Sequence, residues 1–154
     1  MAVRNILKFG DQRLKRVSRR VEKIDKETLN IIEDLKDTLY STTGIGLAAP
    51  QIGVLKRIVI IDLRDESEPI IIINPLIVAK LGKEESIEGC LSYPGYEGSL
   101  IRPKKVTVQG LNTIGEKVEY AADGLLAKAF CHEIDHLDGI LYIDRARKLY
   151  KIED

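Results

Sequence analysis

The chain has 154 residues, of which 44% are hydrophobic and 31% charged, a composition that fits one globular domain spanning residues 1–154. Its 24 basic and 24 acidic side chains balance, so no net positive charge is present to attract nucleic acid or an anionic membrane. No apolar run approaches the roughly 20 residues of a membrane span, and neither a signal peptide nor a disulfide-rich pattern is present. We therefore expect a cytoplasmic protein of bacterial type that binds neither a membrane nor, by itself, nucleic acid.

The first part of the chain predicts a basic, solvated segment over 1–23, followed by a helix over about 26–42. Asp25 stands where an N-cap is needed. Apolar residues then recur at three- and four-residue spacing, as they do on one face of a helix, at Leu29, Ile32, Leu35 and Leu39.

The stretch "GIGLAAPQIG", residues 44–53, is a candidate ligand-binding loop. Gly44 and Gly46 are small enough to let backbone approach a ligand closely, and Gln51 carries an amide donor. Taken alone the stretch is weak, because most small-residue loops after helices are merely turns.

The middle of the chain is dominated by β-branched residues. "KRIVIIDL" (56–63) and "PIIIINPLIV" (69–78) are too short for buried helices and predict strands. Residues 104–111 and 116–122 flank "NTIG" and predict a hairpin, in which Gly115 can adopt a positive φ.

A second helix is expected over 124–138, with Asp123 as its N-cap and Gly139 at its C-terminal end. Few elements alternate as strand, helix, strand. The sequence therefore predicts an α+β fold, with antiparallel strands packed around this helix. The helix has an apolar side composed of Leu125, Leu126, Ala129, Phe130 and Leu137.

The same helix carries the only two histidines of the chain, in "HEIDH". His132 and His136 are four residues apart, which places both rings on one face within reach of one metal ion. Glu133 lies between them, where a carboxylate can reach a metal-bound water. A metzincin-type peptidase would place its third ligand at position 142, which is Tyr142, and the short remaining tail has no room for a second ligand helix.

The third ligand is therefore expected upstream, at Cys90 in the Gly-rich turn "IEGCLSYPGYEG". A lone cysteine is more often a small buried hydrophobe, but thiolate is the softest ligand that the chain offers. Cys131 is adjacent to His132 and so points about 100° away on the helix. We expect Cys131 to be an inert core residue. One cysteine and two histidines leave a fourth position open, as in catalytic sites.

Together, "GIGLAAPQ", "EGCLS" and "HEIDHLDG" resemble, in this order, the three signature motifs of the peptide deformylases. The resemblance extends over nearly the whole chain, through "ILKFGDQRLKRVS", "RIVIIDL", "INPLIV", "ADGLLAKAFCHE" and "GILYIDR". It implies a deformylase fold and a hydrolase that removes the formyl group from the N-terminal formyl-methionine of nascent polypeptides, releasing formate.

The resemblance also implies a ligand set and a metal. Cys90, His132 and His136 would hold one divalent ion, natively Fe²⁺, for which Zn²⁺, Ni²⁺ or Co²⁺ can substitute. Ligand softness alone would favour Zn²⁺.

Catalytic and substrate-binding roles follow in the same way. Glu133 would take a proton from metal-bound water and pass it to the leaving amine. Gln51 and the backbone N–H of Leu91 would stabilise the oxyanion. Gly46 would contact the substrate, and the strand edge near Ile45 would hydrogen-bond the peptide in extended form.

The chain also departs from the family pattern in places. Cys131 stands where many members have glutamine. "RARKLYKIED" replaces the long C-terminal helix that contacts the ribosome in many bacterial members, and "YPGYEGSL" lacks an arginine that others carry. Association with the ribosome and peptide preference beyond methionine therefore stay open. We further expect Glu88 to pair with Arg102 and brace the cysteine motif, with an ordinary solvated carboxylate as the alternative.

Two other functions remain to be weighed at this point. An HExxH metallopeptidase would cleave unformylated peptides internally, and a non-catalytic homologue would keep the metal for stability alone. The second has no use for Glu133 or Gln51, and both residues are present.

Overall fold

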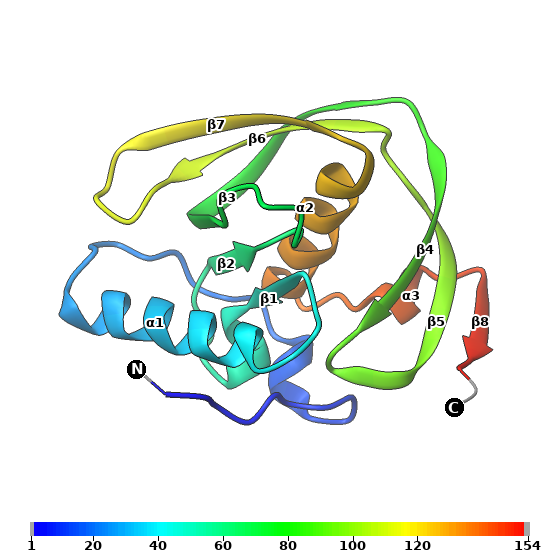
Figure 1. Cartoon of the computed structure of the whole chain (residues 1–154), viewed down its shortest axis with the longest axis horizontal. Coiled ribbons are helices and arrows are strands. Elements are labelled where there is room, and N and C mark those ends of the chain that lie inside the picture. Colours follow the sequence, from blue (N-terminus) through cyan, green and yellow to red (C-terminus); the bar gives the residue numbers. More distant parts are fainter. Residues whose placement is uncertain (1, 153–154) are drawn as a thin grey trace.

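The computed structural model describes residues 2–152, which form two antiparallel sheets around a central helix (Figure 1). A five-stranded sheet has the order β1-β2-β3-β6-β7, and a three-stranded sheet has the order β4-β5-β8. The predicted α+β class is therefore confirmed. The helices and strands are α1 (Lys26–Tyr40), β1 (Gly46–Ala48), β2 (Ile58–Ile61), β3 (Ile70–Leu81), β4 (Glu84–Cys90), β5 (Tyr93–Arg102), β6 (Lys105–Leu111), β7 (Lys117–Asp123), α2 (Gly124–Leu137), α3 (Tyr142–Arg145) and β8 (Lys148–Lys151), with 3₁₀ turns at Gln12–Lys15 and Ala49–Ile52.

Within the five-stranded sheet, β2 is buried on both faces, which explains why its sequence is continuously apolar. Successive side chains of a strand point to opposite faces. Ile58 and Ile60 belong to the core cluster shared with α1, whereas Val59 and Ile61 belong to the cluster shared with α2. All four are at most 1% exposed. Burying each such side chain contributes roughly 1.5–3 kcal/mol, so this sheet fixes the position of both helices.

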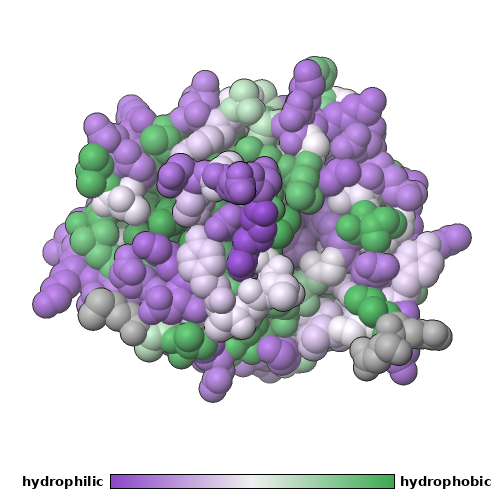
Figure 2. Space-filling view, in the orientation of Figure 1, coloured by the Kyte–Doolittle hydropathy of each residue, from purple (hydrophilic) through white to green (hydrophobic). Residues whose placement is uncertain are grey.

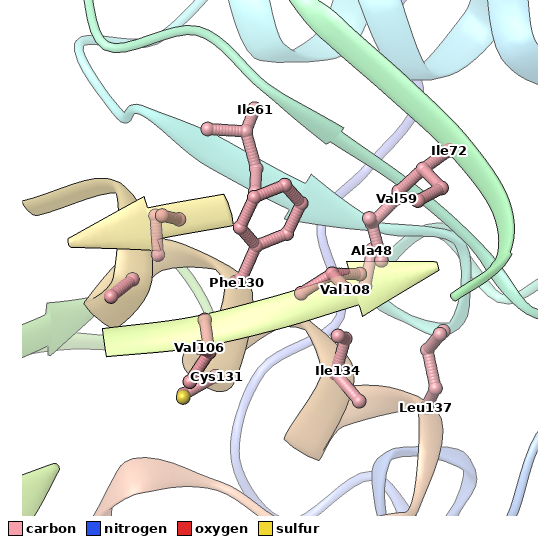
Figure 3. Close-up of a cluster of buried hydrophobic side chains, with 13 residues drawn as sticks. Ala48, Val59, Ile61, Ile72, Val106, Val108, Phe130, Cys131, Ile134 and Leu137 are labelled. Carbon is pink, nitrogen blue, oxygen red and sulfur yellow. The ribbon is translucent and has the colours of Figure 1, made fainter. Parts of the chain in front are cut away.

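The core beneath α2 is a compact group of aliphatic and aromatic side chains (Figure 3). Phe130 and Leu137 are fully buried and lie in one cluster with Val106 and Val108 of β6. Cys131 belongs to this cluster and is 5% exposed, which confirms the prediction of a core cysteine. This face of α2 packs in the core. The opposite face of the helix is therefore held in a fixed position next to β1 and β4.

The helix ends follow local chemistry. The Asp25 carboxylate accepts a hydrogen bond from the Thr28 N–H at 3.0 Å, as an N-cap does. α1 ends at Tyr40 rather than at 42, because the Ser41 and Thr42 hydroxyls bond the last carbonyls instead. Gly139, at φ 75°, closes α2 through hydrogen bonds of a Schellman motif.

The structure corrects the sequence predictions on the apolar helix faces and on the first segment. Leu29 and Leu125 were assigned to apolar faces but are 43% and 54% exposed, since each lies in the first turn of its helix. Asp123 is the N-cap residue of α2, as predicted, but its side chain makes no capping hydrogen bond. The first segment is not simply solvated, because Leu14 and Val21 are buried in the core.

The cysteine motif also differs from the expected turn. Cys90 is the last residue of β4, which pairs with β5 in a long hairpin through registers such as Ser86↔Leu100. Only Leu91 and Ser92 separate the two strands. Glycine and glutamate obscure the strand pattern in this stretch, because its side chains make specific polar contacts instead of packing by alternation.

The surface carries charge and hydrophobic side chains in small groups. Figure 2 shows hydrophilic residues over much of one face, with hydrophobic patches between them. Within residues 2–152, none of the helices has the length and apolar character needed to cross a bilayer.

Candidate metal centre and active site

A cavity of about 840 Å³ opens where the edge strands of the two sheets approach α2. β1 is the edge of the five-stranded sheet and β4 is the edge of the three-stranded sheet, and residues of both line the cavity with residues of α2. Its wall includes the predicted site residues Ile45, Gly46, Gln51, Cys90, Leu91, His132 and Glu133. The remaining predicted residue, His136, is fully buried and lies behind Cys90.

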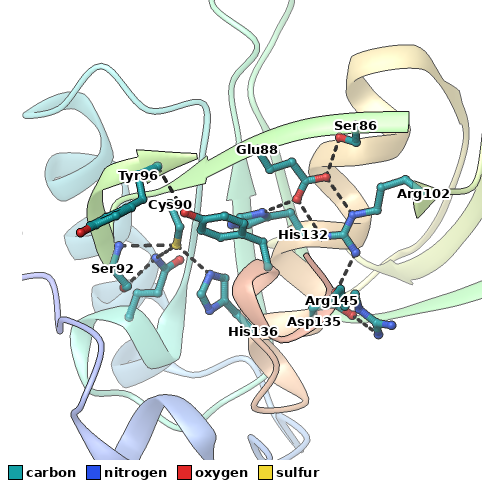
Figure 4. Close-up of polar contacts among 12 residues, drawn as sticks. Ser86, Glu88, Cys90, Ser92, Tyr96, Arg102, His132, Asp135, His136 and Arg145 are labelled. Carbon is teal, nitrogen blue, oxygen red and sulfur yellow. Dashed lines mark hydrogen bonds and ion pairs between the residues drawn. The ribbon is translucent and has the colours of Figure 1, made fainter. Parts of the chain in front are cut away.

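One sulfur and two imidazole rings converge at the inner end of this cavity (Figure 4). The Cys90 Sγ lies 3.3 Å from the His136 Nε2, and the ligand atoms of Cys90, His132 and His136 all lie within 4.8 Å of one another. The His132 Nδ1 is 2.8 Å from a Glu88 carboxylate oxygen. This contact commits Nδ1 to Glu88 and leaves Nε2 for the cavity.

The donor set fits a divalent transition metal. Thiolate and imidazole are ligands for Zn²⁺, Fe²⁺ and related ions, and three protein ligands leave a position open for chemistry. Burial, and then the charge of His132, lower the pKa of His136 well below 6.5, so its ring is neutral as a ligand must be. Burial by itself lowers the pKa of His132, but Cys90 and Glu88 outweigh it and raise that pKa well above 6.5. A metal held here would compete with a proton for His132.

Glu133 lies beside these ligands with a free oxygen. Its side chain is 5% exposed, and its Oε1 has no hydrogen-bond partner among the described residues. Burial raises its pKa to about 7, and the nearby His132 charge offsets only part of that effect. A carboxylate with a pKa near neutrality is suited to take up and release a proton at physiological pH.

Gly46 provides the room for this carboxylate. A Cβ built at Gly46 would lie 2.5 Å from the Glu133 Oε2, closer than nonbonded atoms approach. Similarly, a Cβ at Gly44 would lie 2.9 Å from the Leu91 Cδ1. The glycines predicted to admit a ligand therefore also admit two side chains of the site itself.

The oxygen and the nitrogen of the Gln51 side-chain amide both form hydrogen bonds, and these hold the amide beside the Cys90 sulfur. Its Oε1 accepts from the Ala48 N–H at 2.9 Å, and its Nε2 donates to the Ser92 Oγ at 3.1 Å and lies 3.7 Å from the Cys90 Sγ. Gln51 is 1% exposed and cannot rotate freely. The role of Ser92 was missed, although its place at the end of "EGCLS" was a usable signal.

The free edge of β1 also faces the cavity. The Ile45 carbonyl accepts from the Asp62 N–H at 2.7 Å, on the side of β2. Because hydrogen bonds alternate along an antiparallel ladder, the N–H and C=O of Gly46 point to the opposite, open side. The groups available to a peptide therefore include those of Gly46, while the Ile45 carbonyl is already committed.

Behind the histidines lies a network of charges around the buried Arg102 (Figure 4). Arg102 donates to both carboxylate oxygens of Glu88, at 2.8 and 2.7 Å, and to Asp135 at 2.7 Å. Arg145 also donates to Asp135. Burial alone would raise the pKa of Glu88, but the hydrogen bonds from Arg102 and His132 hold it far below 4.5. The predicted Glu88–Arg102 pair is therefore confirmed, and Asp135 is a partner that the sequence did not reveal.

Tyr142 occupies the position at which a metzincin would place a third histidine. Its ring stacks on His132 with a centroid distance of 6.1 Å and an interplanar angle of 22°, and its hydroxyl donates to the Tyr96 carbonyl. At this position the chain therefore has an aromatic side chain packed against His132, and not a third histidine ligand.

A buried carboxylate beside one cysteine and two histidines that could hold a metal ion, in a cavity bounded by strand edges, is the arrangement of a metal-dependent hydrolase. The sequence profile of the Polypeptide deformylase family matches residues 3–151. The chain belongs to this family, whose members are metal-dependent enzymes that remove the N-formyl group from nascent formyl-methionyl peptides. The peptidase and non-catalytic alternatives are accordingly not favoured.

Individual relatives agree. The chain is 48% identical over 145 residues to peptide deformylase 1 of Clostridium acetobutylicum, covering 94% of this chain and 95% of that one. The crystal structure of a peptide deformylase from Legionella pneumophila superposes with a TM-score of 0.91 at 45% identity, covering 94% of this chain and 86% of that one. A Synechococcus elongatus peptide deformylase, solved in complex with actinonin, gives a TM-score of 0.89 at 42% identity, covering 93% and 78%.

Proposed function

We propose that Cys90, His132 and His136 hold the metal of this deformylase, and that Glu133 is its general base and acid. The observation that carries the proposal is the buried, unpartnered Glu133 oxygen beside three convergent ligand side chains. A metal bound there supplies Lewis acidity, which makes a water nucleophilic at neutral pH.

The protein groups divide the remaining work. Glu133 accepts a proton from the attacking water and delivers it to the leaving amine, so that the formyl C–N bond breaks and formate departs. The Gln51 amide and the Leu91 backbone N–H donate to the oxygen on which negative charge develops. Fixed donors of this kind are worth roughly 2.7–4 kcal/mol each. Gln51 is suited to this role because Ala48 and Ser92 already fix its orientation.

The peptide is proposed to lie extended between the two edge strands. Gly46 offers backbone groups from β1, and β4 offers a second edge on the other side of the cavity. A strand edge forms hydrogen bonds with the backbone of the peptide and not with its side chains. This mode of binding suits an enzyme whose substrates have many different N-terminal sequences. Apolar side chains of the wall, Ile45, Ile87 and Leu125, are suited to the methionine side chain.

For the metal we propose Fe²⁺ as the native ion, with Zn²⁺, Ni²⁺ or Co²⁺ able to substitute. Affinity alone favours Zn²⁺ at a thiolate and two imidazoles. Turnover favours an ion that accepts a further ligand more readily than tetrahedral Zn²⁺ does. Anaerobically prepared Fe²⁺ protein should therefore be more active than Zn²⁺ protein at equal occupancy. Equal rates for the two forms would argue against iron.

The proposed setting is the bacterial cytoplasm, where nascent chains carry formyl-methionine. Association with the ribosome is a separate part of this proposal, and residues 148–151 belong to β8, which pairs with β5. Co-sedimentation with ribosomes, at low and high salt, tests this part separately.

The decisive assay for the function is formate release from a formyl-Met peptide, with the acetyl-Met peptide as a matched control. We expect formate from the first and no hydrolysis of the second. Internal cleavage of unformylated peptides would instead indicate a peptidase, and absence of turnover in metal-loaded protein would indicate a non-catalytic homologue.

A further inference from the structure

The cavity wall formed by residues 42–46 is held by side chains from another part of the chain. This segment joins the end of α1 to β1 (Figure 1), and it includes Gly44 and Gly46. Thr42 through Gly46 all line the cavity. None of these five residues is fully buried, so apolar packing alone does not fix the wall.

Arg64, three residues beyond the end of β2, reaches back to this segment. Its Nη2 donates to the carbonyls of Leu39 at 3.2 Å, Thr42 at 3.2 Å and Gly44 at 3.0 Å. The guanidinium carbon also lies 5.1 Å from the centre of the Tyr40 ring. One side chain therefore binds the last turn of α1 and the two ends of the 42–44 loop together.

Asp62 sets the position of that arginine. Its carboxylate accepts from the Arg64 N–H at 2.9 Å and from the Tyr40 hydroxyl at 2.8 Å. Its own N–H donates to the Ile45 carbonyl at 2.7 Å. Arg64 has φ 61°, a left-handed conformation that costs energy for a residue with a Cβ. The turn after β2 is thus shaped to direct Arg64 at the wall.

The wall lies along the path of the peptide, given the proposed function. The formyl end must lie at the metal, beside Gln51 and Cys90, and the free groups of Gly46 come next. From Gly46 the segment leads away from Gln51 toward Gly44 and Thr42. An extended peptide advances about 3.3 Å per residue, so its second and third residues run beside this stretch.

We propose that Arg64 is a positioning residue of this deformylase, which fixes the 42–46 wall against which the second and third residues of the formyl peptide dock. It touches neither the metal ligands nor Glu133, so its effect should fall mainly on KM and grow with peptide length. This inference rests on the proposed function, because it assigns the wall to that substrate.

The test uses two variants of the metal-loaded protein. Arg64→Lys keeps the positive charge but loses the planar guanidinium group with its several donors. Arg64→Asn suits the left-handed backbone conformation, but its side chain is too short to reach the carbonyls that Arg64 binds. Arg20→Lys, at an exposed arginine with no contact to the wall, is the matched control. Formyl-Met peptides of two, three and four residues are assayed, and amide hydrogen exchange is followed over residues 42–46.

We expect kcat/KM of both Arg64 variants to fall roughly tenfold on the tetrapeptide, through KM, and less than threefold on the dipeptide. Exchange over 42–46 should accelerate, while Arg20→Lys matches the wild type. Unchanged exchange in folded Arg64 variants, or equal losses on all peptide lengths, would overturn the inference. If the wild-type protein releases no formate from any peptide, the proposed function fails and this inference falls with it. The exchange data alone then still tell whether Arg64 holds the wall.

Discussion

The five-stranded and the three-stranded sheets both contact α2, but they do so through opposite kinds of side chain. β6 of the large sheet meets Phe130 and its neighbours with valines, in a core without charge. The small sheet meets α2 through Cys90, Glu88 and Arg102, which contact the two histidines and Asp135. Burial therefore fixes where α2 lies, and polar contacts position the side chains on the face of α2 that borders the cavity.

This division predicts that changes on the small-sheet side of α2 act on metal and catalysis, whereas changes on the large-sheet side act on stability. The two cysteines provide the sharpest comparison. Cys90→Ala should lose bound metal and all measurable activity, because two imidazoles alone make a weak site. Cys131→Ala should keep both and lose roughly 1 kcal/mol of unfolding free energy. Metal analysis and formate release decide, and normal metal content in Cys90→Ala would exclude it as third ligand.

Glu133→Gln should separate catalysis from metal binding. The amide can still form hydrogen bonds but cannot accept a proton, so turnover should fall by about 10²–10⁴-fold. Metal content and melting temperature should stay near those of the wild type, since Glu133 is not a ligand. A metal-loaded variant with nearly normal turnover would remove Glu133 from the mechanism.

Arg102→Met should affect stability and metal affinity together. It leaves Glu88 and Asp135 buried without their shared partner, which typically costs about 3–5 kcal/mol of unfolding free energy. It also frees the carboxylate that orients His132, so metal affinity should fall roughly 10–100-fold.

Ile72→Val is the matched change on the large-sheet side. It should cost about 0.5–1.5 kcal/mol and leave metal affinity unaltered. Competition with a chelator measures the affinity of both variants. Equal affinity in Arg102→Met and wild type would contradict the division between the two sheets.

The smallest expected effect is a pH dependence from Glu88. Its folded-state pKa lies below its ordinary value of 4.5, so its ionised form stabilises the fold fully above pH 4.5 and less as the pH falls. The difference in unfolding free energy between wild type and Glu88→Gln should therefore be constant near neutrality and shrink in acid. Denaturant titrations of metal-free protein at several pH values measure it. A difference that grows in acid would reverse the assigned sign.

Elements defined by short-range spacing could be predicted from the sequence. Helical geometry alone puts His132 and His136 on one face and turns Cys131 toward the core. Asp25 and Gly139 mark helix ends because the groups that they satisfy lie within a few residues. The β2 run is readable because a strand buried on both faces is almost entirely apolar, and the β3 run is readable from its β-branched residues.

The rest depended on contacts between distant parts of the chain. The contact between Cys90 and His136 joins residues 46 positions apart, the contact between Arg102 and Asp135 joins residues 33 positions apart, and Gly46 makes room for Glu133 from a still more distant part of the chain. No local pattern encodes such pairings, because each is decided by which surfaces the folded core brings together. By itself, the sequence determined the helix, the placement of both histidines on one of its faces, and the family likeness. Only the tertiary structure decided that β4 places Cys90 and Glu88 beside the histidines. The sequence of a polar strand has no apolar periodicity from which its packing partner could be predicted.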